Sequence, residues 1–186
     1  MASFDGVDSV IDCGDADDFE VLDRSMTYSV WIKTSYSGSQ RKQVFAMMSP
    51  TPNYDGVSLM PRPNDECSPD ALGFNVNYDW DGAENVDANA LQRINDGTWH
   101  HICGIIDRDE EAAKLYIDGV LDVGETGCNW LPILDTTGFG ISDSGSISFL
   151  IGDRGNLGRY WDGEIDELRI YNQALTVQEV QILSHQ

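Results

Sequence analysis

The sequence predicts an all-β sandwich that ends in a short helical turn, and three observations support this fold class. Short β-type runs recur along the chain with turn residues between them, and apolar and polar residues alternate within the runs. Asp118 and Gly119 separate two such runs, which is a strong hairpin signal. Only residues 175–183 follow a helical pattern, opened by Thr176 with Glu179 three positions later as a capping box. Many short strands followed by one helical turn are typical of a sandwich.

The expected strands follow one another without a linker or a convincing internal repeat, so we expect a single domain over residues 1–186. The strands are expected at residues 2–6, 7–12, 27–33, 44–48, 72–78, 97–106, 113–122, 149–154 and 163–171. The run 27–33 carries an aromatic residue on each face, Tyr28 and Trp31, which predicts a central strand. Residues 61–69 have the composition of a loop.

The charge balance argues against two classes of partner. The chain has 11 basic and 32 acidic residues and a formal net charge of −21. Nucleic acid and anionic lipid are bound through clustered Lys and Arg, so we expect neither as a partner. No apolar run approaches the ~20 residues of a membrane helix, so we expect no direct membrane insertion. The acidic residues fit general surface charge, and a few of them could bind calcium through carboxylate oxygen.

The cysteines and histidines do not form a recognisable metal motif. The four cysteines are Cys13, Cys67, Cys103 and Cys128. They include no C-x-x-C pair, which excludes a zinc ribbon and a thioredoxin-like motif. Cys103 falls in an expected buried strand, whereas Cys67 and Cys128 fall in expected loops and could pair in an oxidising compartment. All three full pairings stay open. His100 and His101 are adjacent, so we expect them on opposite faces of a strand, where they cannot chelate one ion.

Several segments, in order along the chain, are together characteristic of one family. They are residues 4–8, 28–33, 96–102, 115–120, 151–152 and 163–175, the last reading Gly-Glu-Ile-Asp-Glu-Leu-Arg-Ile-Tyr-Asn-Gln-Ala-Leu. The series closely resembles the laminin G-like, pentraxin-like modules of the concanavalin A-like lectin and glucanase superfamily. The resemblance implies a jelly-roll sandwich of two antiparallel sheets, often with a bound calcium ion. It also implies a module appended to a larger extracellular or cell-surface protein.

Asp166 is the first candidate metal ligand. Strand alternation places it on one face with Leu168 and Ile170, and therefore at the edge of the core. A carboxylate in that position is costly unless it is paired, hydrogen-bonded or bound to a metal. Two interpretations stay open: Asp166 caps backbone N–H groups of a loop, or it shares a structural calcium with Asp5 and nearby carbonyl oxygens. The family resemblance suggests the calcium.

A second candidate calcium site lies at residues 77–82. Asn77, Asp79 and Asp81 occupy positions one, three and five of a calcium loop, with glycine at position six. Position twelve is Ala88 instead of Glu, so the alternative is an Asp-Gly turn between strands. Trp80 lies among these oxygen donors, and an exposed indole suits the apolar face of a sugar. We therefore expect Asp79 and Trp80 to contact a ligand.

The loop 153–162 is the other candidate ligand site. It combines carboxylate, guanidinium, amide and aromatic groups, a mixture suited to sugar hydroxyls and sugar ring faces. Its candidate ligand-binding residues are Asp153, Arg154, Asn156 and Tyr160. The alternative is an ordinary solvated connection whose Tyr160 or Trp161 packs on the core, and we expect Trp161 to face the core.

A glycosidase mechanism is disfavoured at residues 164–169. Related glucanases carry Glu-x-Asp-x-Glu or Glu-x-Asp-x-x-Glu on one strand face, which supplies the nucleophile and the acid of a retaining enzyme. Glu164 and Asp166 match the first two positions. The third acid is replaced by Leu168 in one spacing and by Arg169 in the other. We therefore expect no enzyme activity.

Together these features predict a non-catalytic carbohydrate-binding or adhesion module, stabilised by calcium, in a larger extracellular or cell-surface protein. Its expected partners are a glycan or another cell-surface ligand, and the other domains of the parent protein. The alternative is a structural or protein-interaction module of the laminin G kind that binds no sugar. A third possibility, a glycosidase or lyase-like enzyme, conflicts with the missing acid.

Overall fold

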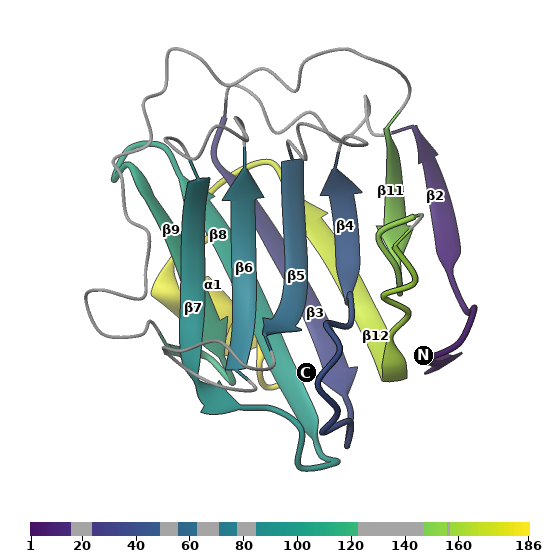
Figure 1. The fold of residues 1–186 in the computed structure, drawn as a ribbon. Helices are drawn as coiled ribbons and strands as arrows, with labels where there is room; N and C mark the ends of the chain where they lie inside the picture. Colours follow the sequence, from purple (N-terminus) through teal and green to yellow (C-terminus); the bar gives the residue numbers. More distant parts are fainter. Residues whose placement is uncertain (16–23, 49–55, 63–70, 78–84, 123–146, 156) are drawn as a thin grey trace.

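Two six-stranded antiparallel sheets face each other in a computed structural model of the chain (Figure 1). The structure describes residues 1–15, 24–48, 56–62, 71–77, 85–122, 147–155 and 157–186. Sheet A consists, in spatial order, of β1 (Ala2–Asp5), β12 (Asp162–Tyr171), β3 (Met26–Lys33), β8 (Trp99–Asp107), β9 (Ala112–Ile117) and β10 (Val120–Leu121). Sheet B consists of β2 (Ile11–Asp15), β11 (Ser148–Ile151), β4 (Phe45–Met48), β5 (Gly56–Arg62), β6 (Ala71–Asn77) and β7 (Asn85–Arg93). The predicted jelly-roll sandwich of two antiparallel sheets is confirmed.

Three strands differ from the sequence prediction. The strand expected at residues 7–12 begins only at Ile11, as β2, because residues 6–9 form the turn that Asp5 caps. β5 runs through Pro61, whose surroundings have the composition of a loop, and β7 runs through the Asp- and Asn-rich segment up to Arg93. Pairing between β4 and β5 ends at Leu59, so the missing N–H of Pro61 interrupts no ladder on that side. β7 is an edge strand of weak intrinsic β-propensity, and its pairing with β6 decides its conformation.

The hairpin predicted at Asp118 and Gly119 is confirmed. Ile117 of β9 pairs with Val120 of β10, so Asp118 and Gly119 form the two-residue turn between the strands. Both have positive φ, 51° for Asp118 and 79° for Gly119, which is the geometry that tight hairpin turns require. This turn places the Asp118 carboxylate beside the start of β8, where it contacts His100 and accepts a hydrogen bond from the His101 N–H.

The two sheets interlock through aromatic side chains in one core. The Tyr28 ring of sheet A stacks on Phe45 of sheet B with 5.4 Å between ring centroids, and Phe45 stacks on Phe149 at 5.6 Å. Gly104 of β8 lies against the ring of Phe74, and a Cβ at this position would come within 2.6 Å of that ring. Glycine therefore lets the large aromatic side chain of sheet B pack directly on the backbone of β8.

Helix α1 (Val177–Leu183) packs on the outer face of sheet A. The buried residues of this contact are Cys103, Ile105, Tyr116, Leu175, Val180 and Leu183. The predicted capping box is confirmed, because Thr176 accepts from the Glu179 N–H and the Glu179 carboxylate accepts from the Thr176 N–H. Burial raises the pKa of the Cys103 thiol to about 12, so Cys103 packs as a small apolar group. Within the described ranges, no helix has the length and apolarity needed to cross a membrane.

Candidate functional site

The outer face of sheet A remains open beside helix α1. In β3, Tyr28 and Ile32 point into the core and are almost fully buried. Because side chains alternate along a strand, Trp31 and Lys33 point outward, and both are only partly buried. The helix covers the neighbouring part of this face, around Cys103. This leaves a patch of sheet surface that carries an aromatic side chain.

A second tryptophan completes this patch. Trp31 pairs with His101 of β8 and Lys33 pairs with Trp99, so the two indoles occupy diagonal positions on neighbouring strands. Diagonal neighbours lie ~7–8 Å apart, within reach of aromatic side chains. Trp99 is also partly exposed. We call this pair the Trp31–Trp99 platform.

An open depression of about 430 Å³ lies over the platform. Its lining consists of Trp31, Trp99, Asp166, Glu167, Arg169 and Gln186. The volume falls within the ~300–1,000 Å³ typical of small-molecule sites. Two indoles thus meet carboxylate, guanidinium and amide groups, so the depression can stack an apolar ring face and hydrogen-bond its hydroxyls.

A β-bulge in β12 brings the charged groups to the depression. Asp166 pairs with Trp31, and the register then shifts before pairing resumes at Arg169. Glu167 and Leu168 occupy the shift, where two residues oppose one on β3. Glu167 has φ of 51°, an uncommon conformation for a residue with a side chain. Bulges of this kind commonly redirect side chains next to functional sites.

The bulge corrects the expectation that Asp166 shares a face with Leu168 and Ile170. Leu168 and Ile170 pack against the core, whereas the Asp166 side chain is 38% exposed on the outer face. Strict alternation fails here because an extra residue reverses the facing of every position beyond it. Asp166 is therefore a residue of the open face and not of the core edge.

Ion pairs surround the depression. They join Lys33 to Glu164 (2.9 Å), Arg169 to Glu167, and the amino group of Met1 to Asp166 (2.6 Å). The hydrogen bond from the Met1 amino group, assisted by the Glu167 N–H, holds the pKa of Asp166 below its usual range. Lys33 Nζ also lies 5.9 Å from the centroid of the Trp99 ring. The two acids considered for catalysis, Glu164 and Asp166, are thus each bound to a cation.

His101 lies beside Trp31 on the outer face of sheet A, as its direct partner on β8. Its ring is fully buried, 5.3 Å from the Trp31 ring between centroids, and its Nε2 hydrogen-bonds the Ser29 hydroxyl at 2.9 Å. Burial lowers the pKa of His101 to about 4; the Asp118 carboxylate opposes this shift and the Arg169 charge adds to it. The imidazole is therefore neutral at pH 7, and it supports the platform as a packed, uncharged ring.

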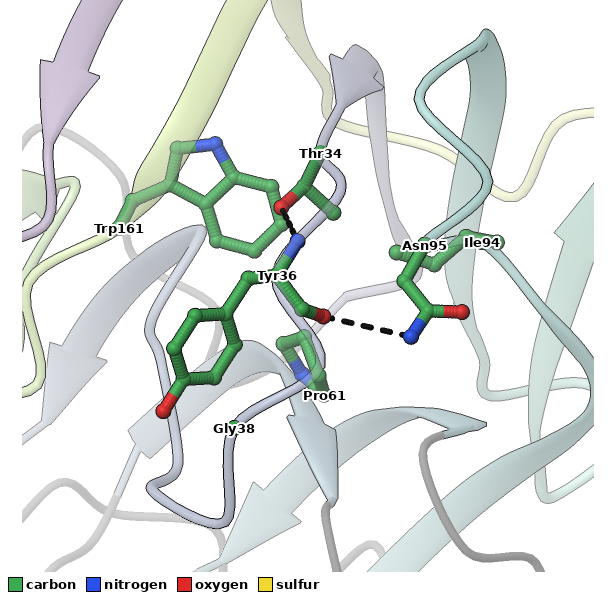
Figure 2. A pocket seen from close by; sticks show the side chains of 7 residues that line it. All are labelled: Thr34, Tyr36, Gly38, Pro61, Ile94, Asn95 and Trp161. Atoms are coloured by element: carbon green, nitrogen blue, oxygen red, sulfur yellow. Dashed lines mark hydrogen bonds between the residues drawn. The ribbon is translucent and has the colours of Figure 1, made fainter.

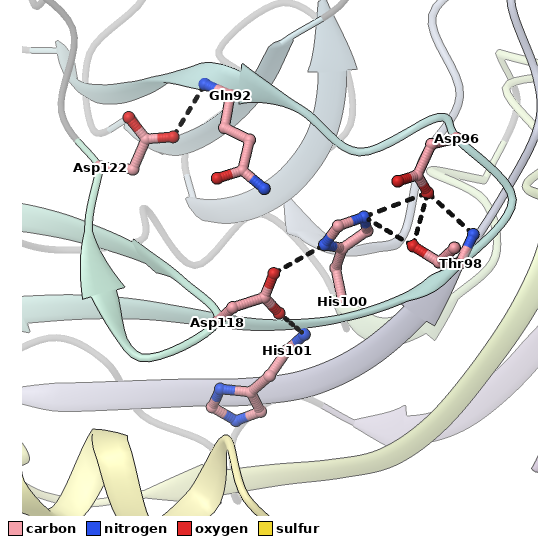
Figure 3. A network of polar contacts seen from close by, with 7 residues as sticks. All are labelled: Gln92, Asp96, Thr98, His100, His101, Asp118 and Asp122. Atoms are coloured by element: carbon pink, nitrogen blue, oxygen red, sulfur yellow. Dashed lines mark hydrogen bonds and ion pairs between the residues drawn. The ribbon is translucent and has the colours of Figure 1, made fainter.

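His100 points to the other side of β8, as Figure 3 shows and as predicted. Its Nδ1 lies 2.8 Å from Asp118, and its Nε2 lies 3.2 Å from Asp96. Asp118 also accepts the backbone N–H of His101 at 2.8 Å, so one carboxylate contacts both histidines. Hydrogen bonds from Thr98, with smaller help from His100, lower the pKa of Asp96 to about 2. This network fixes the start of β8, which carries Trp99 and His101.

Asp5 caps the turn that follows β1. Its Oδ1 accepts hydrogen bonds from the N–H groups of Val7, Asp8 and Ser9, at 3.0–3.3 Å, and from the Ser9 hydroxyl at 2.9 Å. These donors, the Val7 N–H first, hold the pKa of Asp5 well below its usual range. The negative charge of Asp5 is thus stabilised by its own turn.

The described residues do not fit a calcium ion shared by Asp5 and Asp166. Asp5 pairs with Asp162, four residues before Asp166, which corresponds to ~13 Å along the strand. Calcium binds its oxygen ligands at ~2.3–2.6 Å, so one ion does not reach both carboxylates. The carbonyl oxygen of Gly6, in the same turn, accepts a hydrogen bond from buried Lys42 at 3.1 Å. Among the described residues, no three acidic, His or Cys side chains cluster as a metal site would.

The loop after β11 differs from its expected role. The Asp153 side chain is 2% exposed and accepts the Arg159 N–H at 3.0 Å, so it holds the loop together and does not face a ligand. Arg154 and Tyr160 are partly buried. Trp161 is 1% exposed and packs in the core, which confirms the alternative interpretation for this residue.

The remaining predicted site residues are not tested. Asp79, Trp80, Asp81 and Asn156 lie outside the described residues, as do Cys67 and Cys128. The strand β6 ends at Asn77, whose side chain is likewise outside the description. Their roles in calcium or ligand binding stay predictions.

The sequence prediction missed the Trp31–Trp99 platform. The signal was present, because Trp31 alternates with core residues of β3 and so had to face outward. The pairing of β3 with β8, which brings Trp99 alongside, is a long-range contact that the sequence does not state.

A second, much smaller cavity lies between Trp161 and Tyr36 (Figure 2). Two hydrogen bonds hold the backbone of Tyr36 at this cavity: its N–H donates to Thr34 Oγ1 (3.0 Å), and its carbonyl accepts from Asn95 Nδ2 (3.3 Å). Its volume is about 10 Å³, room for one water molecule at most. We interpret it as a packing gap at the edge of the core.

A family model described as the concanavalin A-like lectin/glucanases superfamily matches residues 5–181. The chain belongs to this superfamily. The predicted resemblance is thereby confirmed. A search among curated proteins found no match to the chain.

Several solved structures share this fold, among them two protein–sugar complexes. One is domain 4 of AbnA, a GH43 extracellular arabinanase from Geobacillus stearothermophilus, in complex with arabinotriose. It is 25% identical to this chain, with a TM-score of 0.64, and the match covers 97% of this chain and 74% of that one. The CBM40 of the Ruminococcus gnavus IT-sialidase, bound to α2,3-sialyllactose, is 13% identical, with a TM-score of 0.67 and coverages of 98% and 97%. A heptameric SAP-like pentraxin from Limulus polyphemus is 16% identical, with a TM-score of 0.60 and coverages of 87% and 70%. At such identities the last two show the fold alone.

Proposed function

We propose that the chain is a non-catalytic carbohydrate-binding module and that the Trp31–Trp99 platform is its sugar site. The observation that carries this proposal is the pairing of two partly exposed indoles beneath a depression rimmed by hydrogen-bonding groups. The C–H face of a sugar stacks on aromatic rings, and its hydroxyls bind carboxylate and guanidinium groups. The arabinotriose and sialyllactose complexes of the structural relatives support sugar recognition by this fold.

Two features support the absence of catalysis. The third acid of the glucanase pattern is replaced by Leu168 or Arg169. Glu164 is ion-paired with Lys33, and Asp166 with the Met1 amino group. A retaining glycosidase needs two carboxyl groups free to act on opposite sides of one bond.

Alanine substitution of either platform tryptophan is expected to weaken sugar binding at least ~10-fold, which corresponds to ~1.4 kcal/mol. Each substitution removes one stacking surface while leaving the buried core untouched. Binding of a panel of oligosaccharides to Trp31→Ala and Trp99→Ala, followed by calorimetry on the best ligand, measures this loss. Val120→Ala is the matched control, because Val120 is an exposed apolar residue on β10.

Normal binding by both platform variants, together with loss of binding in Trp80→Ala, would move the site to residues 77–82. Absence of binding to any oligosaccharide would leave the protein-interaction alternative, and the sugar-binding proposal would be wrong.

We further propose that the module belongs to a larger extracellular or cell-surface protein, and that calcium stabilises its segment 77–82 through Asn77, Asp79 and Asp81. The carboxylate and amide oxygens of these residues suit calcium. The proposal leaves out Asp5 and Asp166, because Asp5 is occupied by its own turn and Asp166 by an ion pair.

Calcium is expected to raise the melting temperature, and EDTA is expected to reverse this. At a calcium concentration ~100 times its Kd, the added stability is ~2.7 kcal/mol. Thermal unfolding of Asp79→Asn and Asp81→Asn should show little calcium response. Asp5→Asn should keep the full response although its turn is weakened; a response lost in Asp5→Asn alone would place the ion at β1 instead.

A further inference from the structure

We propose that the Trp31–Trp99 platform selects oligosaccharides without acidic groups, because the carboxylates of its rim exclude uronic acids, sialic acids and sulfated sugars. This inference rests on the proposed function and names the ligand class of that site. The rim consists of three carboxylates, those of Glu164, Asp166 and Glu167, and of two cations that are paired with them, Lys33 and Arg169.

The rim offers no ready partner for an anionic ligand. Lys33 is held by Glu164 at 2.9 Å, and Arg169 is held by Glu167. Arg169 also donates to the side-chain oxygen of Gln186 at 2.9 Å. A ligand carboxylate would have to displace one of these carboxylates and then lie beside it, where like charges repel.

The charge of the whole chain acts in the same direction. A formal net charge of −21 gives the surface a negative potential, which lowers the local concentration of anionic ligands. The depression is open, so solvent and salt screen this effect. We therefore expect a discrimination that is marked at low salt and weaker at high salt.

Neutral sugars use the same carboxylates as acceptors. Sugar hydroxyls donate hydrogen bonds, and a bond to an ionised carboxylate is roughly twice as strong as one to a neutral acceptor. The exposed oxygens of Asp166 and Glu167, at 38% and 53% side-chain exposure, lie beside the indoles that would stack the ring. The rim thus favours hydroxyls for the same reason that it disfavours acids.

The spacing of the indoles indicates a ligand longer than one ring. Trp31 and Trp99 occupy diagonal positions on β3 and β8, ~7–8 Å apart. One sugar ring covers one indole, so two consecutive rings are needed to use both. We therefore expect affinity to rise from a monosaccharide to a disaccharide and longer chains.

The test compares neutral and acidic oligosaccharides of equal length on the intact chain. The neutral set is cello-, xylo-, manno- and arabino-hexaose, and the acidic set is hexagalacturonate and a heparin hexasaccharide. Sialyllactose, a trisaccharide, is compared with neutral trisaccharides of the same series. The best neutral ligand is expected to bind at least ~10-fold more tightly than any acidic one at low salt. The ratio should shrink near 1 M salt, where the Debye length falls to ~3 Å.

A charge variant identifies the residues that discriminate. Glu164→Gln combined with Glu167→Gln releases Lys33 and Arg169, and is expected to raise acidic binding several-fold. Glu110→Gln is the control for removing a negative charge away from the platform; its partner Lys114 stays paired with Asp107 at 2.8 Å. The control should leave the ratio unchanged.

Each result decides between the two proposals. Acidic ligands that bind as well as neutral ones, in a manner sensitive to Trp31→Ala, would overturn the ligand class but keep the sugar site. An equal gain in Glu110→Gln would attribute the discrimination to net charge and overturn the role of the rim. No binding by either set would refute the proposed function itself.

Discussion

Replacing Trp161 with alanine is expected to lower the free energy of unfolding by about 3–5 kcal/mol. The indole is 1% exposed and belongs to the main core. Its backbone joins two other segments: its N–H donates to the Gly152 carbonyl at 2.7 Å, and its carbonyl accepts the Gly6 N–H at 2.8 Å. Removing the side chain enlarges the small gap that the indole lines together with Thr34, Tyr36 and Pro61 (Figure 2). For a chain of this size the melting temperature should fall by roughly 6–20 °C, measured by thermal unfolding.

The control is Trp99→Ala, which removes an indole of the same size from a partly exposed position. It should change stability much less while weakening sugar binding. Trp161→Phe should be milder than Trp161→Ala, because it retains part of the volume and removes a buried N–H that has no partner among the described residues. Equal melting temperatures for Trp161→Ala and Trp99→Ala would contradict the core assignment.

The fold could be predicted because its signals are local. The Asp118-Gly119 turn, the alternation of β3 and the capping box at Thr176 each depend on a few neighbouring residues, and each is confirmed. β5 and β7 escaped prediction for the opposite reason. Pro61 and the polar residues of β7 disfavour strands locally, and the pairing of both strands with β6 overrides that preference.

The candidate site could not be predicted as well as the fold, because it depends on how β3 is aligned with its neighbours β8 and β12. One extra residue near Glu167 moves Asp166 from the core edge to the open face, and alternation alone does not reveal such a bulge. Trp31 and Trp99 are 68 positions apart in the sequence, and only the pairing of β3 with β8 makes them neighbours. By contrast, Asp153 lies in a loop whose composition suits ligand binding, but the residue is buried and has a structural role.

Lowering the pH from 6.5 towards 4.5 is expected to destabilise the protein through His101. Its pKa is lowered from 6.5 to about 4, mainly by burial. Its Nε2 bonds Ser29, and its Nδ1 is buried with no partner among the described residues, so a second proton there would find no acceptor. The neutral ring is therefore the form that the fold accommodates.

The sign follows from proton binding in the two states. Between pH 6.5 and 4 the unfolded chain protonates this histidine and the folded chain does not, so stability is full above pH 6.5 and falls as the pH is lowered. The total from His101 is on the order of 3 kcal/mol, since each pKa unit corresponds to ~1.4 kcal/mol. Four of the described aspartates also have lowered pKa values and lose their contribution mainly below their ordinary pKa of 3.8: Asp5, Asp96, Asp107 and Asp166. Glu179 loses its contribution from its ordinary pKa of 4.5 downwards. Most of the loss from His101 therefore comes above the range of these carboxylates, and a variant without the histidine identifies it.

The measurement is urea unfolding at several pH values from 4.5 to 7, for the wild type and for His101→Gln. Glutamine can still bond Ser29 but does not titrate, so its stability should depend much less on pH even if it is lower throughout. His185→Gln is the control, because His185 is exposed at the end of the chain and should leave the wild-type slope intact. Identical slopes for the wild type and His101→Gln would show that folding does not lower the pKa of His101. The buried, unprotonated environment inferred for this ring beside Trp31 would then have to be abandoned.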